Sequence, residues 1–151
     1  MDSAASSTTA KVTHPWNFFH DETGYNYRMT NLNAAVGCAQ MECIDDFLQN
    51  KRELARLYLA FFQKTNIRFF SEPENCRSNY WLNLLLFENE TERNTFLKIT
   101  NEHGVMTRPF WTMMNKLPMY KTCYSGNLEN ANRLEATGVN IPSGVRKNLL
   151  S

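Results

Sequence analysis

Apolar and polar positions alternate with a helical period from Asn31 to Lys64. Apolar or small side chains recur every three or four residues, and charged side chains mostly fill the positions between them. That spacing places the apolar positions on one face of an α-helix. No proline interrupts the stretch, yet it is long for one globular helix. We therefore expect one helix bent near Asp45 or two helices in tandem. The apolar positions are Leu32, Ala35, Ala39, Cys43, Phe47, Leu54, Tyr58 and Phe61.

The rest of the chain alternates strand-like and helical patterns. Residues 80–88 form a continuous apolar run of strand length, typical of a strand buried on both faces. Helical spacing returns at 91–103, where Phe96, Leu97 and Ile99 should face inward, and Gly104 can end that helix. This order predicts an α+β fold, a small sheet with helices on one side. The remaining expected elements are a loop at 68–78, an extended segment at 105–111, a loop at 112–124, a helix at 127–137 ended by Gly138, and a strand at 139–142.

A polar loop, GYNYR, precedes the long helical pattern. Thr30 or Asn31 can cap the helix that follows, because a short side-chain oxygen accepts from the free amides of the first turn. Donors gathered at a helix start can hold an anion. A surface loop followed by an ordinary core helix is the plainer interpretation, since helix starts that offer amides are common. Small residues let this helix approach another backbone closely: Ala34, Ala35, Gly37 and Ala39.

Composition and charge exclude several classes of function. The chain has 151 residues, enough for one domain with a real core, and its net charge of +1 gives no global field for nucleic acid or an anionic membrane. No apolar run approaches membrane-spanning length, and residues 1–9 are small and polar without a signal core. We expect a soluble, cytoplasmic protein whose first residues are disordered or form a strand stub without a partner. The four cysteines have no regular spacing, which suits neither a disulfide framework nor a metal site, so free thiols are expected.

Catalytic motifs are missing from the sequence. It contains no glycine pattern for a nucleotide phosphate and no GxSxG elbow. The three histidines are scattered, and each is more typical of a surface or satisfied core residue than of a ligand. From the residues alone, the chain is a soluble α+β domain with one unusual polar loop and one aromatic-rich loop.

Several blocks of the sequence nevertheless resemble one enzyme family. GYNYRM…NLNAA…AQ, NYWLNLLLF, GVMTRPFW, LPMY and NIPSG are similar to the C-terminal part of the DegT/DnrJ/EryC1/StrS family. These are nucleotide-sugar aminotransferases that depend on pyridoxal phosphate. The resemblance spans Ser6 to Gly144 and implies the C-terminal part of a fold type I aminotransferase. TRPFW…LPMY is similar to the branch acting on keto-sugars of the bacillosamine, legionaminic acid and perosamine pathways.

The resemblance implies that three successive parts of the chain belong to different domains of the enzyme. Residues 1–29 would end the large domain, residues 30–64 would form the connecting helix or helices, and residues 65–151 would form the small α+β domain. The intact enzyme would transfer an amino group from an amino acid, commonly glutamate, to a nucleotide-linked keto-sugar in polysaccharide or glycan biosynthesis. The partner would be a second copy or a separate large-domain chain.

The family's Schiff-base lysine lies upstream of the matched segment, and Lys11 is not that lysine. We therefore expect no catalytic residue in this chain and no activity from it alone. A non-enzymatic interaction module that retains the small-domain fold is the alternative.

The resemblance also implies binding residues. Asn26 would reach the cofactor phosphate of the neighbouring subunit, and Arg28 would add charge there or only order the loop. Arg108 and Trp111 would lie near the sugar-nucleotide pocket, where an arginine can fork onto a diphosphate and a tryptophan can stack on a ring. The alternative roles are equally compatible with the sequence: Arg108 would form a structural salt bridge, and Trp111 would be an aromatic residue of the core. Asn115 stands where many relatives carry histidine, and an amide cannot exchange a proton at neutral pH.

Overall fold

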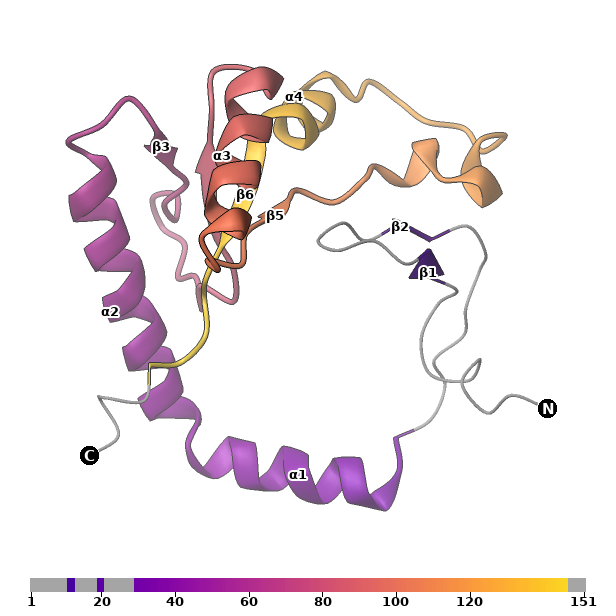
Figure 1. Ribbon diagram of the computed structural model, residues 1–151. Helices are drawn as coiled ribbons and strands as arrows, with labels where there is room; N and C mark the ends of the chain where they lie inside the picture. The colour runs from indigo at the N-terminus through magenta and orange to yellow at the C-terminus, as the bar shows by residue number, and fades with distance from the viewer. Residues whose placement is uncertain (1–10, 13–18, 21–28, 147–151) are drawn as a thin grey trace.

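The computed structural model describes residues 11–12, 19–20 and 29–146 (Figure 1). The expectations for residues 1–9, for Asn26 and for Arg28 lie outside the described residues. Two short strands, β1 (Lys11–Val12) and β2 (Phe19–His20), pair antiparallel ahead of the main fold.

The long helical pattern forms two helices in tandem, α1 (Asn31–Glu42) and α2 (Ile44–Phe62). Thr30 caps α1, since its Oγ1 accepts from the N–H of Asn33 at 3.3 Å. Cys43 separates the helices and offers α2 no side-chain cap. Figure 1 shows α2 turning away from α1 at this point. The break is therefore close to the expected bend at Asp45, and the tandem alternative is the one observed.

Four strands form an antiparallel sheet in the order β3-β4-β6-β5. Leu85 in β4 lies opposite both Phe69 in β3 and Val139 in β6. The expectation of a plain loop at 68–78 is wrong, because β3 falls within it; a two-residue strand has too few positions to show a period. The strand bounds are Arg68–Phe69 for β3, Asn83–Leu86 for β4, Arg108–Pro109 for β5 and Gly138–Ile141 for β6.

Helices α3 (Glu90–Glu102) and α4 (Glu129–Thr137) match the predicted helices. Asn89 caps α3 by accepting from the N–H of Glu92 at 2.9 Å, and Gly104 after it adopts a φ of 75°, which favours glycine. The predicted loop at 112–124 contains two short 3-10 turns, Met114–Lys116 and Pro118–Tyr120.

The core joins one face of the sheet to α2 and α3, so the predicted α+β layer is confirmed. Leu85 and Val139 are fully buried at its centre. The expectation that Ile99 faces inward is wrong, since it is 51% exposed; Leu97, two positions earlier and nearly opposite on the helix, is buried instead. The core residues are Ala55, Phe69, Leu85, Phe87, Leu97, Val139 and Ile141.

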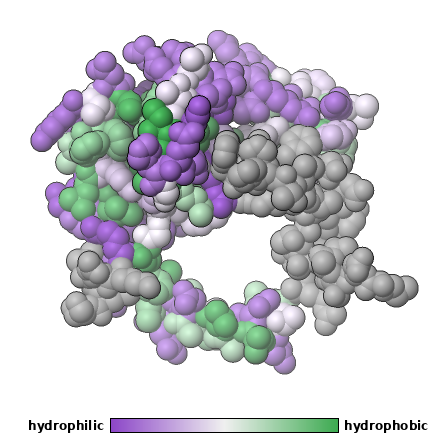
Figure 2. Space-filling model, in the orientation of Figure 1, coloured by the Kyte–Doolittle hydropathy of each residue, from purple (hydrophilic) through white to green (hydrophobic). Residues whose placement is uncertain are grey.

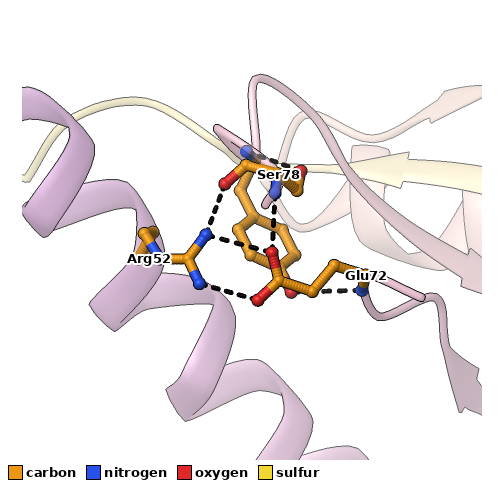
Figure 3. Close-up of polar contacts among 4 residues, drawn as sticks. Arg52, Glu72 and Ser78 are labelled. Carbon is orange, nitrogen blue, oxygen red and sulfur yellow. Dashed lines mark hydrogen bonds and ion pairs between the residues drawn. The ribbon is translucent and has the colours of Figure 1, made fainter. Parts of the chain in front are cut away.

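An ion pair fastens the loop between β3 and β4 onto α2 (Figure 3). The guanidinium of Arg52 donates to both carboxylate oxygens of Glu72, at 3.0 and 2.6 Å, and to the carbonyl of Ser78 at 2.6 Å. Glu72 in turn accepts from the N–H of Ser78 at 2.6 Å. The Tyr80 ring lies under the guanidinium, 5.7 Å from its carbon. One charged pair thus fixes both ends of a proline-containing loop.

The segment after β6 is held by the same helix. The buried Asn50 side chain donates to the Arg146 carbonyl at 3.1 Å and accepts from its N–H at 3.0 Å. Lys51 Nζ donates to the carbonyls of Ser143 at 2.5 Å and Trp81 at 3.3 Å, and burial lowers the pKa of this ammonium group. Two successive polar residues of α2 therefore hold the chain just before β4 and just after β6.

Glu72 makes stability depend on pH. The Arg52 guanidinium, and after it the Ser78 N–H, hold the pKa of the Glu72 carboxyl below its ordinary value. The stability that this carboxylate contributes is present above the unfolded pKa of about 4.3 and is lost as pH falls through the lower folded pKa. We expect Glu72→Gln to melt below wild type at pH 7, and the gap to close as pH falls below about 4.

Glu53→Gln is the matched control for thermal melts across this pH range. Glu53 makes a similar two-pronged contact with Arg56, at 2.9 and 2.7 Å, but within one turn of α2 and toward solvent. Exposed pairs of that kind contribute little, so its effect should be smaller. Equal effects for both variants would show that the Glu72 pair does not hold the loop.

Gly138 stands where α4 meets β6 without space for a side chain. A Cβ there would lie 2.6 Å from the Leu134 carbonyl oxygen and 3.0 Å from Phe110 Cβ. We expect Gly138→Ala to lower the free energy of unfolding by about 1–3 kcal/mol in urea denaturation, because the backbone has to shift. Gly37→Ala in α1, with nothing within 4 Å, should instead gain about 0.5–1 kcal/mol. A neutral Gly138→Ala would contradict the tight junction.

Candidate functional site

The tryptophan expected near a substrate pairs with a second one. Trp111 is 45% exposed and stacks on Trp81, with ring centroids 6.1 Å apart and planes 25° apart. Phe110 meets Trp111 edge-on at 5.7 Å. Trp111 is therefore not the core aromatic that was left open as an alternative. Its pairing adds an aromatic residue that the sequence had not singled out.

Trp81 was missed because it fell inside the run 80–88 expected to be one buried strand. In the structure β4 begins only at Asn83, and Tyr80 adopts a φ of 45°, so the chain turns before the strand. Trp81 is 65% exposed as a result. The only signal available was its place in the NYWLNLLLF block.

Arg108 lies in β5, opposite Asn140 of β6. Side chains alternate along a strand, and the preceding Thr107 points to α3, where its Oγ1 meets Thr100 Oγ1 at 2.6 Å. Arg108 is thus directed to the face of the sheet away from α3. There its Nη2 lies 3.4 Å from Met106 Sδ.

Asn115 lines a different, mostly apolar pocket of about 490 Å³ beneath the 3-10 turns. Its Oδ1 is buried and has no hydrogen-bond partner among the described residues. Arg108 and Trp111 do not line this pocket, so the structure does not bring all three predicted substrate residues into one cavity. The pocket is lined by Met113, Met114, Asn115, Tyr120, Cys123, Tyr124, Ser125, Leu128 and Ala131.

Two further hollows are occupied by paired charges. A groove of about 1140 Å³ runs along α2 and includes the Arg52–Glu72 pair. A smaller polar pocket of about 250 Å³ lies between α3, α4 and the end of β5. It holds Arg93, paired with Glu90 at 3.0 Å, and Lys116, paired with Glu135. The Arg52–Glu72 and Lys116–Glu135 pairs connect separate elements, whereas Arg93 and Glu90 both belong to α3.

Two lysines of the described residues are tied to other elements. Lys51 is engaged with two carbonyls, and Lys116 with Glu135. All four cysteines are free and exposed, as predicted. Across residues 29–146 and the two short strands, no three His, Cys, Asp or Glu side chains gather as a metal would need. No described helix combines the length and apolarity required to cross a membrane. The described surface offers stacking and hydrogen bonding.

Solved structures share this fold. Helicobacter pylori PseC, an aminotransferase involved in pseudoaminic acid biosynthesis, matches with a TM-score of 0.71 at 17% identity, over 93% of this chain and 39% of its own. The aminotransferase TlmJ from Streptoalloteichus hindustanus matches with a TM-score of 0.69 at 19% identity, over 85% and 35%. At such low identity these likenesses show the fold, and they confirm the expected aminotransferase architecture.

Comparison with curated protein sequences identifies the family of this chain. The GDP-perosamine synthase of Escherichia coli O157:H7 is 34% identical over 126 residues, and that of Vibrio cholerae is 32% identical over 133. Each alignment covers 83% of this chain, which spans only about a third of the relatives' length, 34% and 35%. The profile of the DegT/DnrJ/EryC1/StrS aminotransferase family matches residues 5–148. The chain therefore belongs to the DegT/DnrJ/EryC1/StrS aminotransferase family.

Proposed function

We propose that this chain supplies the C-terminal third of a sugar aminotransferase that depends on pyridoxal phosphate. The intact enzyme transfers an amino group from an amino acid, with glutamate as donor, to a nucleotide-linked keto-sugar in polysaccharide or glycan biosynthesis. The family match over residues 5–148 is the observation that carries the proposal. Relatives named GDP-perosamine synthase support a GDP-linked sugar.

The described residues do not fit pyridoxal phosphate by themselves. Covalent attachment of that group needs a lysine free to act as a nucleophile and an acid beside the ring nitrogen. Lys51 and Lys116 already serve as donors to other elements, and Lys98 lies 4.0 Å from Glu102 of the same helix. Lys64 and Lys121 are exposed and line none of the three hollows described above. The chain's contribution is therefore to bind and to position, and the covalent anchor belongs to another part of the enzyme.

Within this proposal each predicted residue has a separate task. Arg108 forks onto the diphosphate of the sugar nucleotide and Trp111 stacks on a ring of it. Asn26 donates to the cofactor phosphate of a neighbouring subunit, with Arg28 beside it. Asn115 contributes an amide but no proton transfer.

A partner is part of the proposal, either a second copy or a large-domain chain. No residue of α1 is buried, although its apolar side chains include Leu32, Val36 and Met41, which are 78%, 58% and 65% exposed. Figure 2 shows hydrophobic surface, interspersed with hydrophilic residues, along α1 at the bottom of the view. Contiguous exposed apolar surface marks an interaction site. In this assignment residues 1–29 end the large domain, residues 30–64 connect, and residues 65–151 form the small domain of a cytoplasmic enzyme.

The test is a chimaera in which this chain replaces the matching third of the E. coli GDP-perosamine synthase. With glutamate and GDP-4-keto-6-deoxymannose, mass spectrometry should detect a GDP-linked amino sugar. Arg108→Ala should raise KM about tenfold, because a charge-assisted fork to the diphosphate is lost. Arg56→Ala, which removes an exposed arginine paired with Glu53, should leave KM unchanged.

Two results would count against this proposal. A folded chimaera without any product would favour the non-enzymatic interaction module. An Arg108→Ala variant with unaltered KM would remove Arg108 from the substrate site while leaving the enzyme assignment intact.

The exposed face of α1 predicts self-association of the chain on its own. In sedimentation velocity we expect dimers or larger species, and Leu32→Glu with Val36→Glu should shift the population at least tenfold toward monomer, since charge disfavours an apolar contact. Ile99→Glu, on α3 at 51% exposure, is the control and should change nothing. A monodisperse, cooperatively melting wild-type monomer would contradict the prediction.

A further inference from the structure

The Trp81–Trp111 pair leaves an unusual amount of aromatic surface in solvent. Tryptophan is highly buried on average, and burying it is a large part of its stabilising value. Here both indoles stack on each other while remaining 65% and 45% exposed. A pair formed only to fill the core would have its outer faces covered. This pair instead leaves a large part of both indoles in solvent.

Both indoles stand on fixed backbone. The N–H of Trp81 donates to Asn79 Oδ1 at 3.0 Å, and its carbonyl accepts from Lys51 of α2. On the other side, Phe110 supports Trp111 edge-on, and the Phe110 N–H donates to the Gly138 carbonyl at 3.0 Å. A surface held in this way loses little conformational entropy when a ligand binds.

The chemistry of this face suits the planar base of a nucleotide. Aromatic side chains stack on any base, because every base has a π-face. Each indole has one face covered by the other, and Trp81 is the more exposed of the two, at 65% against 45% for Trp111, so its outer face is the more accessible to a third ring.

We infer that Trp81 and Trp111 form a stacking platform for the base of the nucleoside diphosphate, with Trp81 in direct contact. The inference rests on the proposed function and deepens it, since it assigns the base to a residue outside the predicted site. Stacking tolerates different bases, so the platform holds a nucleotide without selecting guanine over thymine.

Equilibrium dialysis of the 151-residue chain with GDP tests the platform. Trp81→Leu should weaken GDP binding about tenfold, within the range that stacking on one aromatic residue contributes, and Trp81→Phe should recover most of it. Phe61→Leu is the matched control, since Phe61 is 64% exposed on α2 and should not affect GDP. Inorganic pyrophosphate, which has no base, should bind wild type and Trp81→Leu equally.

Three outcomes would overturn the inference. They are GDP binding unchanged by Trp81→Leu, equal weakening of GDP and pyrophosphate, and no GDP binding by either the chain or the chimaera. The chimaera separates the two proposals: product formation with unaltered GDP affinity in Trp81→Leu defeats the platform alone. A folded chimaera that binds GDP through Trp81 but makes no product defeats the enzymatic function instead.

Discussion

The Arg52–Glu72 ion pair is the contact on which the exposed face of this fold depends. Its two side chains are 33% and 24% exposed, and each also bonds the backbone of Ser78, so the pair is screened less than a surface pair. By fixing the loop that leads to Tyr80, it sets the turn from which Trp81 emerges. The position of Trp81 therefore depends on a charge on α2, a helix that carries neither tryptophan, whereas Trp111 follows β5.

The apolar period of α2 predicted only some of the residues that this helix buries. Its apolar period predicts a core-facing stripe through Leu54, Tyr58 and Phe61. Tyr58 does pack against the core, but Ala55 is the α2 residue within it, and Phe61 is 64% exposed. Asn50 is also buried, at 3% exposure, because it bonds both backbone groups of Arg146. A polar residue at that position looks solvent-exposed in any periodic analysis. Its partner lies 96 residues away, so no local pattern could reveal the contact.

Short-range sequence patterns predicted the helices and strands but not the site residues. β4, α3 and α4 follow from apolar runs, caps and the glycine at 104, which act within a few residues. The site residues came only from resemblance, since an arginine or a tryptophan has the same local signature in a core or in a pocket. Trp81 was hidden by a strand prediction that ran past the turn at Tyr80. Asn115 and Trp111 are four residues apart, yet Asn115, in the 3-10 turn Met114–Lys116, lines a pocket that Trp111 does not.

Helix α1 lacks the packing contacts that normally stabilise a helix of its length. A helix of 12 residues is marginal in water by itself, and most helical stability in proteins comes from packing of one face. This helix has one side-chain cap, at Thr30, and no buried residue. Its small residues, with open space around Gly37, permit another backbone to approach closely. If packing supplies its stability, the covering surface must come from outside residues 29–146. The need for such a covering surface follows from the packing of α1 alone and not from the family assignment. It agrees with the finding that the chain spans about a third of the length of the GDP-perosamine synthase from E. coli.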